Sequence, residues 1–338
     1  MKALLDRYRD RLPISTTTPI ISLGEGGTPL VAAAVVGEMV ERQVFLKVEG
    51  ANPTGSFKDR GMTLAISKAV EGGAKAVVCA STGNTSASAA AYAARAGIEC
   101  IVVLPAGQVA AGKLAQAIVH GAKVVAIEGN FDTALQLVRR LADQYPVAVV
   151  NSINPHRLAG QQTAAWEIVE DLGGAPALHA LPVGNGGNIT AAWMGYRELG
   201  LAPRMWGLQA AGAAPLVLGE PVEEPETVAT AIRIGNPASW GGATQARDAS
   251  AGMIAVVTDH EILSAQRLLA EREGIFCEPA SAASVAGLIR YRDELPSGTV
   301  VCTLTGNGLK DTVTPLTGRE LPKSIPAELG AVIVALGW

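Results

Sequence analysis

Short apolar runs alternate with helix-like segments along this chain, and the alternation limits the folds that it can adopt. Five runs in the first half have the length and composition of buried strands, at residues 44–48, 76–80, 100–104, 123–127 and 147–150. Glycines stand where three of the intervening helices would end, at residues 72–73, 97 and 121. A second series follows, with strands expected from Leu178, near 205–208, at 253–257 and from Val300. This spacing predicts parallel sheets built from right-handed crossovers.

A turn leads directly into a helix at Lys58. The run Asn52-Pro53-Thr54-Gly55-Ser56-Phe57-Lys58-Asp59 combines turn-forming proline and glycine with Ser56, which we expect to cap the helix. The partial positive charge of a first helical turn disfavours a protonated ammonium, and a lysine with a lowered pKa can form a Schiff base with an aldehyde cofactor. Most lysines are solvated surface side chains, so this motif alone leaves that alternative open.

The polar loop at residues 81–88 follows one predicted strand and precedes an alanine-rich helix. Its sequence Ser-Thr-Gly-Asn-Thr-Ser-Ala-Ser places five hydroxyls and one amide at a helix start. Free backbone N–H groups at such a start favour a carboxylate or a phosphate. Helix capping, the alternative, accounts for one or two of these residues.

A glycine-rich loop, Gly184-Asn185-Gly186-Gly187-Asn188, opens a helix after the apolar run at 177–183. Glycines let successive backbone N–H groups point at one anion, and the helix adds its positive end. The loop is neither a dinucleotide fingerprint, because Ile189 replaces the third glycine, nor a Walker loop, because no Gly-Lys-Ser/Thr follows. A strand-to-helix turn without a ligand is the alternative.

A fourth polar loop, Thr303-Leu304-Thr305-Gly306-Asn307-Gly308, comes at the end of the last predicted strand. Alone it is weak support for a site. Ligands in open α/β sheets bind beyond the carboxyl ends of the strands, so four such loops are more informative together than singly. The sequence therefore predicts one ligand site to which all four loops contribute.

These motifs resemble those of the threonine synthases, a family of fold-type II pyridoxal phosphate enzymes in the tryptophan synthase β-like superfamily. The resemblance extends from Ser22-Leu23-Gly24-Glu25-Gly26-Gly27-Thr28-Pro29-Leu30 to Lys310-Asp311, which is most of the chain. In the related threonine and serine dehydratases the lysine motif usually continues without Asp59, and a histidine stands in place of Thr85. The glycine loop of those enzymes is also more uniformly glycine.

The resemblance implies a role for each site residue. Lys58 would be the catalytic lysine that holds pyridoxal 5'-phosphate, with Asn84 on the 3-hydroxyl of the cofactor and Thr305 on its pyridine nitrogen. The phosphate of the cofactor would be bound by Gly184, Asn185, Gly186, Gly187 and Asn188. The carboxylate of the substrate would be bound by Ser81, Thr82, Asn84 and Thr85, and its phosphate by Thr85, Ser152, Arg157 and Asn185. Residues 278–282 resemble a cofactor-facing segment of the superfamily, to which we assign no role beyond shaping the site.

The family also implies a two-domain α/β fold with parallel-rich open sheets, flanking helices and the cofactor in the interdomain cleft. Residues 1–50 and 151–338 would form the large cofactor-binding domain, and residues 51–150 a small mobile domain that closes over the substrate. The implied reaction is the last step of threonine biosynthesis, a carbon–oxygen lyase reaction that converts O-phospho-L-homoserine and water to L-threonine and phosphate. Related enzymes are commonly dimers, so we expect a homodimer.

Three alternatives remain open at the level of sequence. A threonine or serine dehydratase would use the same cofactor and lysine, but it needs no phosphate contact from Ser152 or Arg157. A cysteate synthase-like enzyme that acts on phosphoserine would need a similar contact. An inactive phosphate-binding paralogue would not need Lys58.

Composition adds limits on partners and location. The 338 residues are 49% hydrophobic, which suffices for a large core and favours two domains, and the net charge of −4 gives no nucleic-acid footprint. No Cys-x-x-Cys pair and no metal-ligand spacing of histidines occurs, so we expect no metal and reduced, buried thiols. The charged N-terminus lacks the apolar centre of a signal peptide, and the apolar tail at 331–338 is too short to span a bilayer. We therefore expect a cytoplasmic enzyme with no membrane partner, whose tail packs on the protein.

Overall fold

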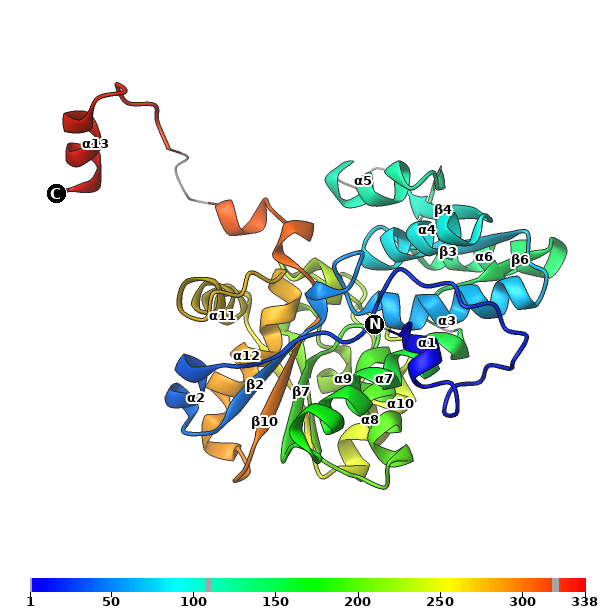
Figure 1. The fold of residues 1–338 in the computed structure, drawn as a ribbon, viewed down its shortest axis with the longest axis horizontal. Coiled ribbons are helices and arrows are strands. Elements are labelled where there is room, and N and C mark those ends of the chain that lie inside the picture. The colour runs from blue at the N-terminus through cyan, green and yellow to red at the C-terminus, as the bar shows by residue number, and fades with distance from the viewer. Residues whose placement is uncertain (1, 107–110, 130, 153, 318–321) are drawn as a thin grey trace.

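The strands of this protein form two separate sheets, as the computed structural model shows (Figure 1). The structure describes residues 2–106, 111–129, 131–152, 154–317 and 322–338. The larger sheet has the strand order β1-β2-β10-β7-β8-β9, and the smaller has the order β5-β4-β3-β6. Neighbouring strands are parallel throughout both sheets, except for the antiparallel pair β1 and β2. The expected α/β fold with parallel-rich sheets is confirmed.

The strands predicted from the apolar runs all form. The larger sheet contains β1 (Leu30–Ala32), β2 (Val44–Val48), β7 (Leu178–Pro182), β8 (Arg204–Ala210), β9 (Met253–Val257) and β10 (Val300–Leu304). The smaller sheet contains β3 (Ala76–Ala80), β4 (Glu99–Pro105), β5 (Lys123–Ile127) and β6 (Val147–Val149). Only β1 was not predicted, because three residues at a sheet edge are too few to show a periodic pattern.

Helices connect the strands and cover the sheets. The first six are α1 (Leu4–Arg7), α2 (Ala34–Val40), α3 (Lys58–Glu71), α4 (Asn84–Ala96), α5 (Ala111–Val119) and α6 (Phe131–Gln144). The others are α7 (Pro155–Leu172), α8 (Gly187–Glu198), α9 (Pro215–Leu218), α10 (Trp240–Ala249), α11 (Asp259–Arg272), α12 (Pro279–Arg290) and α13 (Leu329–Leu336). Glycines end several of them as predicted: Gly97, after α4, has the left-handed φ of +68° that glycine tolerates.

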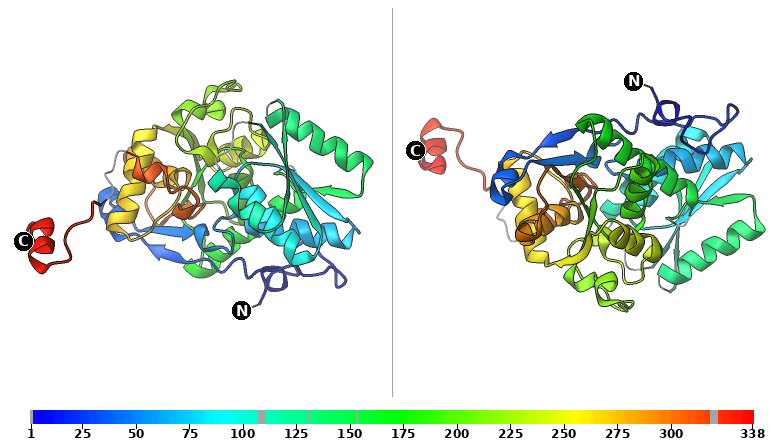
Figure 2. Two further views of the ribbon diagram at one scale, coloured as in Figure 1. Left: turned by 90° about the horizontal axis from the view of Figure 1, so that it is seen from above. Right: turned by 90° about the horizontal axis from the view of Figure 1, so that it is seen from below.

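Each sheet has helices packed on both faces (Figure 2). In the larger sheet, α2, α11 and α12 pack on one face and α7, α8 and α10 on the other. In the smaller sheet, α3, α4 and α5 pack on one face and α6 on the other. Central strands such as β3, β7 and β10 are buried at every residue, which is why they appear in the sequence as continuous apolar runs.

Two glycines allow α3 and α7 to approach closely. A Cβ atom on Gly61 of α3 would lie 2.5 Å from the carbonyl oxygen of Arg157. A Cβ atom on Gly160 of α7 would lie 2.8 Å from Gly61 Cα and closer still to the carbonyl oxygen of Arg60. Real Cβ atoms do not make such contacts, so this crossing requires glycine on both helices. Because α3 begins at Lys58, the crossing also positions that lysine.

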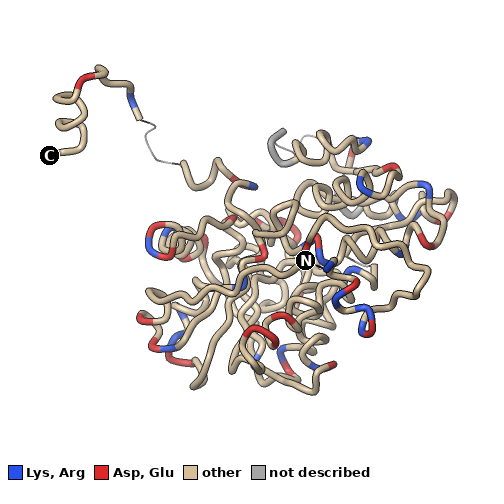
Figure 3. The backbone as a smooth tube through the Cα atoms, in the orientation of Figure 1, with Lys and Arg blue, Asp and Glu red and all other residues tan. Residues whose placement is uncertain are grey.

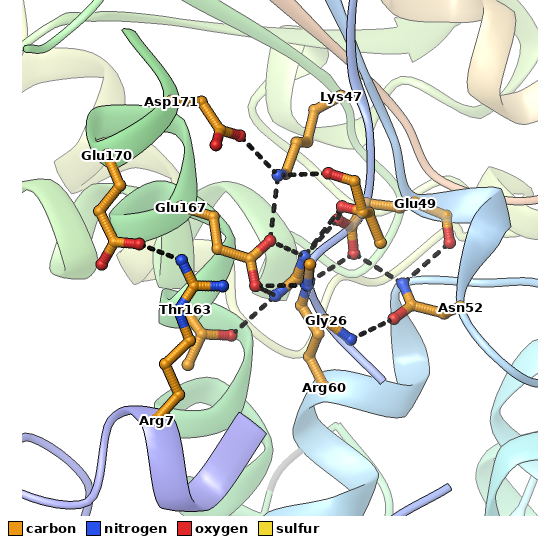
Figure 4. A network of polar contacts seen from close by, with 12 residues as sticks. Arg7, Gly26, Lys47, Glu49, Asn52, Arg60, Thr163, Glu167, Glu170 and Asp171 are labelled. Carbon is orange, nitrogen blue, oxygen red and sulfur yellow. Dashed lines mark hydrogen bonds and ion pairs between the residues drawn. The ribbon is translucent and has the colours of Figure 1, made fainter. Parts of the chain in front are cut away.

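A buried network of charged groups surrounds Arg60 at the same place (Figure 4). Arg60 donates to Glu49 Oε2 from Nε at 2.7 Å and to Glu167 Oε2 from Nη2 at 2.6 Å. Lys47 Nζ pairs with Glu167 Oε2 at 3.0 Å and with Asp171 Oδ2 at 3.4 Å, so the two cations Arg60 and Lys47 face three carboxylates. The network joins α3 to β2 and α7, and breaking one partner of a buried pair typically costs about 3–5 kcal/mol.

The C-terminal helix α13 extends away from the rest of the chain (Figure 1). None of its residues is buried, and Trp338 just beyond it is 87% exposed. Its tube carries no acidic or basic position in Figure 3. The expectation that the tail packs on the protein is therefore wrong. The physical reason lies in the segment before the helix, where Pro322 and Pro326 favour extended backbone. Within the described ranges, no helix has the length and apolar character needed to cross a membrane.

Gly160→Ala tests the close helix crossing. Alanine is ordinarily about 1 kcal/mol better than glycine inside a helix, but here the added methyl group would force α3 and α7 apart. We expect the free energy of unfolding to fall by about 1–3 kcal/mol, measured by denaturant titration. Gly241→Ala in α10 is the control, because no atom lies within 4 Å of its added Cβ. Equal stability of the two variants would contradict the crossing.

Candidate active site

Lys58 is the first residue of α3, as the sequence predicts. Its Nζ atom lies 4.4 Å from the centre of the Phe57 ring. Burial of the amine and the positive charge of Arg157 lower the pKa of Lys58 to about 7, while Glu278 opposes the shift. A large fraction of this amine is therefore neutral, and nucleophilic, near pH 7.

Ser56 does not cap α3, contrary to expectation. Phe57 occupies the N-cap position, and no side chain there accepts a capping hydrogen bond. Ser56 instead pairs with Gly306 in an isolated antiparallel bridge, which fixes its backbone against the loop after β10. Its hydroxyl is buried and has no hydrogen-bond partner among the described residues, so it is available to a ligand.

Asp59 holds the turn before Lys58 in place. Its buried carboxylate accepts hydrogen bonds from Thr54 N at 2.7 Å, Thr54 Oγ1 at 2.6 Å and Ser88 Oγ at 2.6 Å. Burial raises the pKa of Asp59, and these hydrogen bonds oppose the shift. Because Ser88 belongs to α4, Asp59 ties the lysine turn to the helix that follows the 81–88 loop.

The loop after β10 contacts the lysine turn directly. Phe57 N donates to the carbonyl oxygen of Thr305 at 3.0 Å. Thr305 Oγ1 is buried and lies 2.9 Å from Ser281 Oγ in α12, within the 278–282 segment, a pairing that was not predicted. Besides their contact with each other, two such hydroxyls can form one more hydrogen bond, for example with a nitrogen of a ligand ring.

The glycine-rich loop has the shape expected of an anion cradle. Gly186 is in the left-handed region with a φ of +77° and stands at the N-cap of α8. A Cβ atom on Gly184 would lie 2.9 Å from Ile232 Cα, so a larger residue does not fit there. Asn188 Nδ2 is buried without a partner among the described residues. Asn185 Oδ1 accepts from Ala238 N at 3.2 Å and so holds a neighbouring loop, a contact that does not use the Nδ2 donor of this side chain.

The 81–85 segment leads into α4, which begins at Asn84, and is half-buried throughout. Ser81 Oγ accepts from Gly83 N at 3.2 Å, which shapes the loop. Asn84 Nδ2 donates to both carboxylate oxygens of Glu278, at 3.0 and 3.2 Å. Thr82 and Thr85, which lie on either side of Asn84 in the sequence, are also half-buried. Glu278 belongs to the 278–282 segment to which we assigned no role beyond shaping the site, and its contact with Asn84 was not predicted.

Arg157 lies in the first turn of α7 and is only 1% exposed. Its Nη1 atom donates to the carbonyl oxygen of Val150 at 2.8 Å, whereas its Nε atom is buried without a partner among the described residues. Burial lowers the pKa of Arg157 to about 10, so the guanidinium remains charged at neutral pH. Ser152, three residues before this helix, is half-buried.

These groups fit a phosphorylated aldehyde cofactor together with an anionic substrate. The lysine with a lowered pKa suits the aldehyde, and the glycine cradle with Asn188 suits a phosphate. A ligand that supplies acceptors would satisfy the buried donors on Ser56 and Arg157. In the part of the chain that the structure describes, no group of three or more His, Cys, Asp or Glu side chains is placed to hold a metal ion.

Known proteins match this chain along nearly its whole length. Residues 21–306 match the family described as pyridoxal-phosphate dependent enzyme. The chain is 56% identical to the threonine synthase of Synechocystis sp., over 100% of this chain and 91% of that protein. It is 57% identical to the threonine synthase of Mycobacterium leprae, over 98% of this chain and 94% of that protein.

Solved structures share the fold at much lower sequence identity. The structure of maize serine racemase has a TM-score of 0.77 at 19% identity. The match covers 99% of this chain and 94% of the racemase chain. The structure of a T.th. threonine deaminase has a TM-score of 0.75 at 24% identity. The match covers 95% of this chain and 97% of the deaminase chain. These two likenesses show the fold alone. The family match and the full-length relatives show that the chain belongs to the threonine synthase family of pyridoxal-phosphate dependent enzymes.

Proposed function

We propose that this chain converts O-phospho-L-homoserine and water to L-threonine and phosphate. The observation that carries the proposal is the pair formed by Lys58, whose pKa is lowered to about 7, and Arg157, a buried cation with an unpartnered donor among the described residues. A phosphorylated amino acid satisfies both groups, because its phosphate accepts from the guanidinium and its α-carbon needs a base. The full-length similarity to threonine synthases supports this choice of substrate.

Lys58 has two functions in this proposal. It holds pyridoxal 5'-phosphate, which, when bound, supplies the electron sink that makes the α-hydrogen of the substrate acidic. Its neutral amine then accepts a proton from the α-carbon and afterwards from the β-carbon. The low pKa suits this work, since a lysine near its ordinary pKa of 10.5 would be almost fully protonated at neutral pH.

The other groups bind and orient. We propose that the glycine loop from Gly184 to Asn188 holds the phosphate of the cofactor, that Asn84 contacts its 3-oxygen and that Thr305 contacts its ring nitrogen. A hydroxyl cannot keep that nitrogen protonated as a carboxylate would, which favours elimination over transamination. The carboxylate of the substrate would be held by Ser81, Thr82, Asn84 and Thr85, and its phosphate by Thr85, Ser152, Arg157 and Asn185.

We also propose the domain division that the family implies, with residues 51–150 as a small domain and residues 1–50 and 151–338 as a large one. The separate cores of the two sheets support it. Helix α3 packs tightly against both α7 and α4, so it is the helix that joins the two proposed domains.

Phosphate release with three substrates tests the activity. We expect phosphate and threonine from O-phospho-L-homoserine, little phosphate from O-phosphoserine and little deamination of threonine. Lys58→Ala should remove turnover, because the amine proposed to hold the cofactor and accept the proton is lost, and a borohydride-reduced sample of the unmodified protein should carry the cofactor on the peptide that contains Lys58. Preferred turnover of O-phosphoserine, or cofactor label on a different lysine, would contradict the proposal.

Arg157→Ala tests substrate choice. Loss of a charge-assisted contact to phosphate should lower kcat/KM for the phosphorylated substrate by roughly 10- to 100-fold. Slow turnover of threonine or serine, which lack the phosphate, should change far less. Arg290→Ala is the matched control, because Arg290 pairs with Glu261 at the surface. Equal losses on both kinds of substrate would assign Arg157 to the fold or to cofactor binding instead.

A homodimer in the cytoplasm is our proposal for the working form. The exposed apolar helix α13 supports self-association, since an eight-residue helix is marginal in water without a packing partner. The four cysteines are free and buried, which suits a reducing compartment. Light scattering should give about twice the chain mass of 34.7 kDa. A monomer at micromolar concentration would contradict the dimer.

A further inference from the structure

Glu278 is a buried carboxylate that depends on a single donor. It is 6% exposed, and among the described residues its only side-chain hydrogen bonds come from Asn84 Nδ2, at 3.0 and 3.2 Å. A buried carboxylate usually has a cationic partner or several donors, as Asp59 does with three. The unusual feature of Glu278 is that its one contact is a residue of the proposed cofactor site.

The backbone directs this carboxylate across the site. Glu278 occupies the N-cap position of α12, yet its side chain does not cap that helix. Its N–H donates to the carbonyl oxygen of Gly306 at 3.0 Å, and a Cβ atom on Gly306 would lie 2.6 Å from the carboxyl carbon of Glu278. The carboxylate therefore packs against the loop that carries Thr305 and reaches α4 on the other side.

Glu278 and Lys58 affect each other's pKa. Burial raises the pKa of Glu278, whereas the bond from Asn84 and the charges of Lys310 and Lys58 oppose the shift, and Asp311 adds to it. The effect is reciprocal: the charge of Glu278 raises the pKa of Lys58, whereas burial and Arg157 lower it. Lys310 itself bonds elsewhere, to the carbonyl oxygen of Thr54 at 2.7 Å and to Gln116 Oε1 at 2.6 Å.

A side-chain amide nitrogen carries two hydrogens, and an ionised carboxylate can only accept. The contact with Glu278 therefore settles which end of the Asn84 amide is the nitrogen and occupies part of its donor capacity. We propose that Glu278 is a positioning residue, which holds Asn84 so that the remaining N–H is directed to the 3-oxygen of the cofactor. The inference rests on the proposed function, because it needs the cofactor to bind where Asn84 stands.

Two conservative variants separate the hydrogen bond from the charge. Glu278→Gln keeps the length of the side chain and a carbonyl oxygen that can accept from Asn84, but it removes the charge. Glu278→Asp keeps the charge but withdraws the acceptor by one methylene. If the hydrogen bond is what matters, the Gln variant should bind pyridoxal 5'-phosphate within about threefold of the unmodified protein, and the Asp variant on the order of 10-fold more weakly.

The readouts are the dissociation constant of the cofactor, titrated into cofactor-free protein by fluorescence, and the visible absorption band of the bound cofactor. The Asp variant should shift that band as Asn84→Ala does, and the Glu278→Asp, Asn84→Ala double variant should bind no more weakly than Asn84→Ala alone. Glu25→Gln is the matched control. Glu25 is a carboxylate of similar burial that accepts from Tyr92 at 2.7 Å, so its loss should lower the melting temperature without moving the band.

Three results would overturn the positioning role. One is a Gln variant that loses affinity while the Asp variant keeps it, since the charge would then be what counts. Another is additive losses in the double variant, and the third is an unchanged dissociation constant and band in the Asp variant. Failure of the proposed function gives a different result, because the unmodified chain would then show no cofactor binding at all.

Discussion

The close crossing of α3 and α7 is the constraint on which the site depends. Glycine on both helices brings the backbones together, and the buried ion pairs of Arg60 hold α3 to the turn after β2 and to α7 at the same point. Lys58 and Arg157 are the residues that lead into this crossing, one in the first turn of each helix. Their separation is therefore set by backbone packing, which changes little when side chains move.

The two arginines at this crossing have opposite electrostatic surroundings. Arg60 is neutralised by Glu49 and Glu167, whereas Arg157 donates to one carbonyl oxygen and keeps a buried Nε atom without a partner in the described part of the chain. The nearby carboxylate of Asp59 is already occupied by hydroxyl and amide donors. Positive charge near Lys58 thus favours an anionic ligand and lowers the pKa of the lysine.

Sequence patterns predicted the strands and the loops well, because parallel strands buried on both faces leave continuous apolar runs and glycines mark the turns between them. They failed where long-range pairing decides the outcome. Ser56 was expected to cap α3, but its pairing with Gly306, far along the chain, gives the cap position to Phe57. The partnership of Asn84 with Glu278 has the same origin, since no local pattern reports which carboxylate will reach a given amide. The prediction for the tail was wrong for a different reason. Its apolar composition suggested packing, but no residue of α13 is buried within the single chain.

The start of α4 links the two sides of the site. Ser88 holds Asp59 and hence the turn before Lys58, while Asn84, one helical turn earlier, holds Glu278 at the start of α12. A carboxylate bound between these two residues, on the free N–H groups of the helix start, would contact neither the lysine nor α12 directly. It would still affect the positions of Lys58 and α12, because any shift of α4 must move Asp59 and Asn84 together. If the substrate binds at residues 81–85 as proposed, its binding would be mechanically coupled to the positions of Lys58 and Glu278.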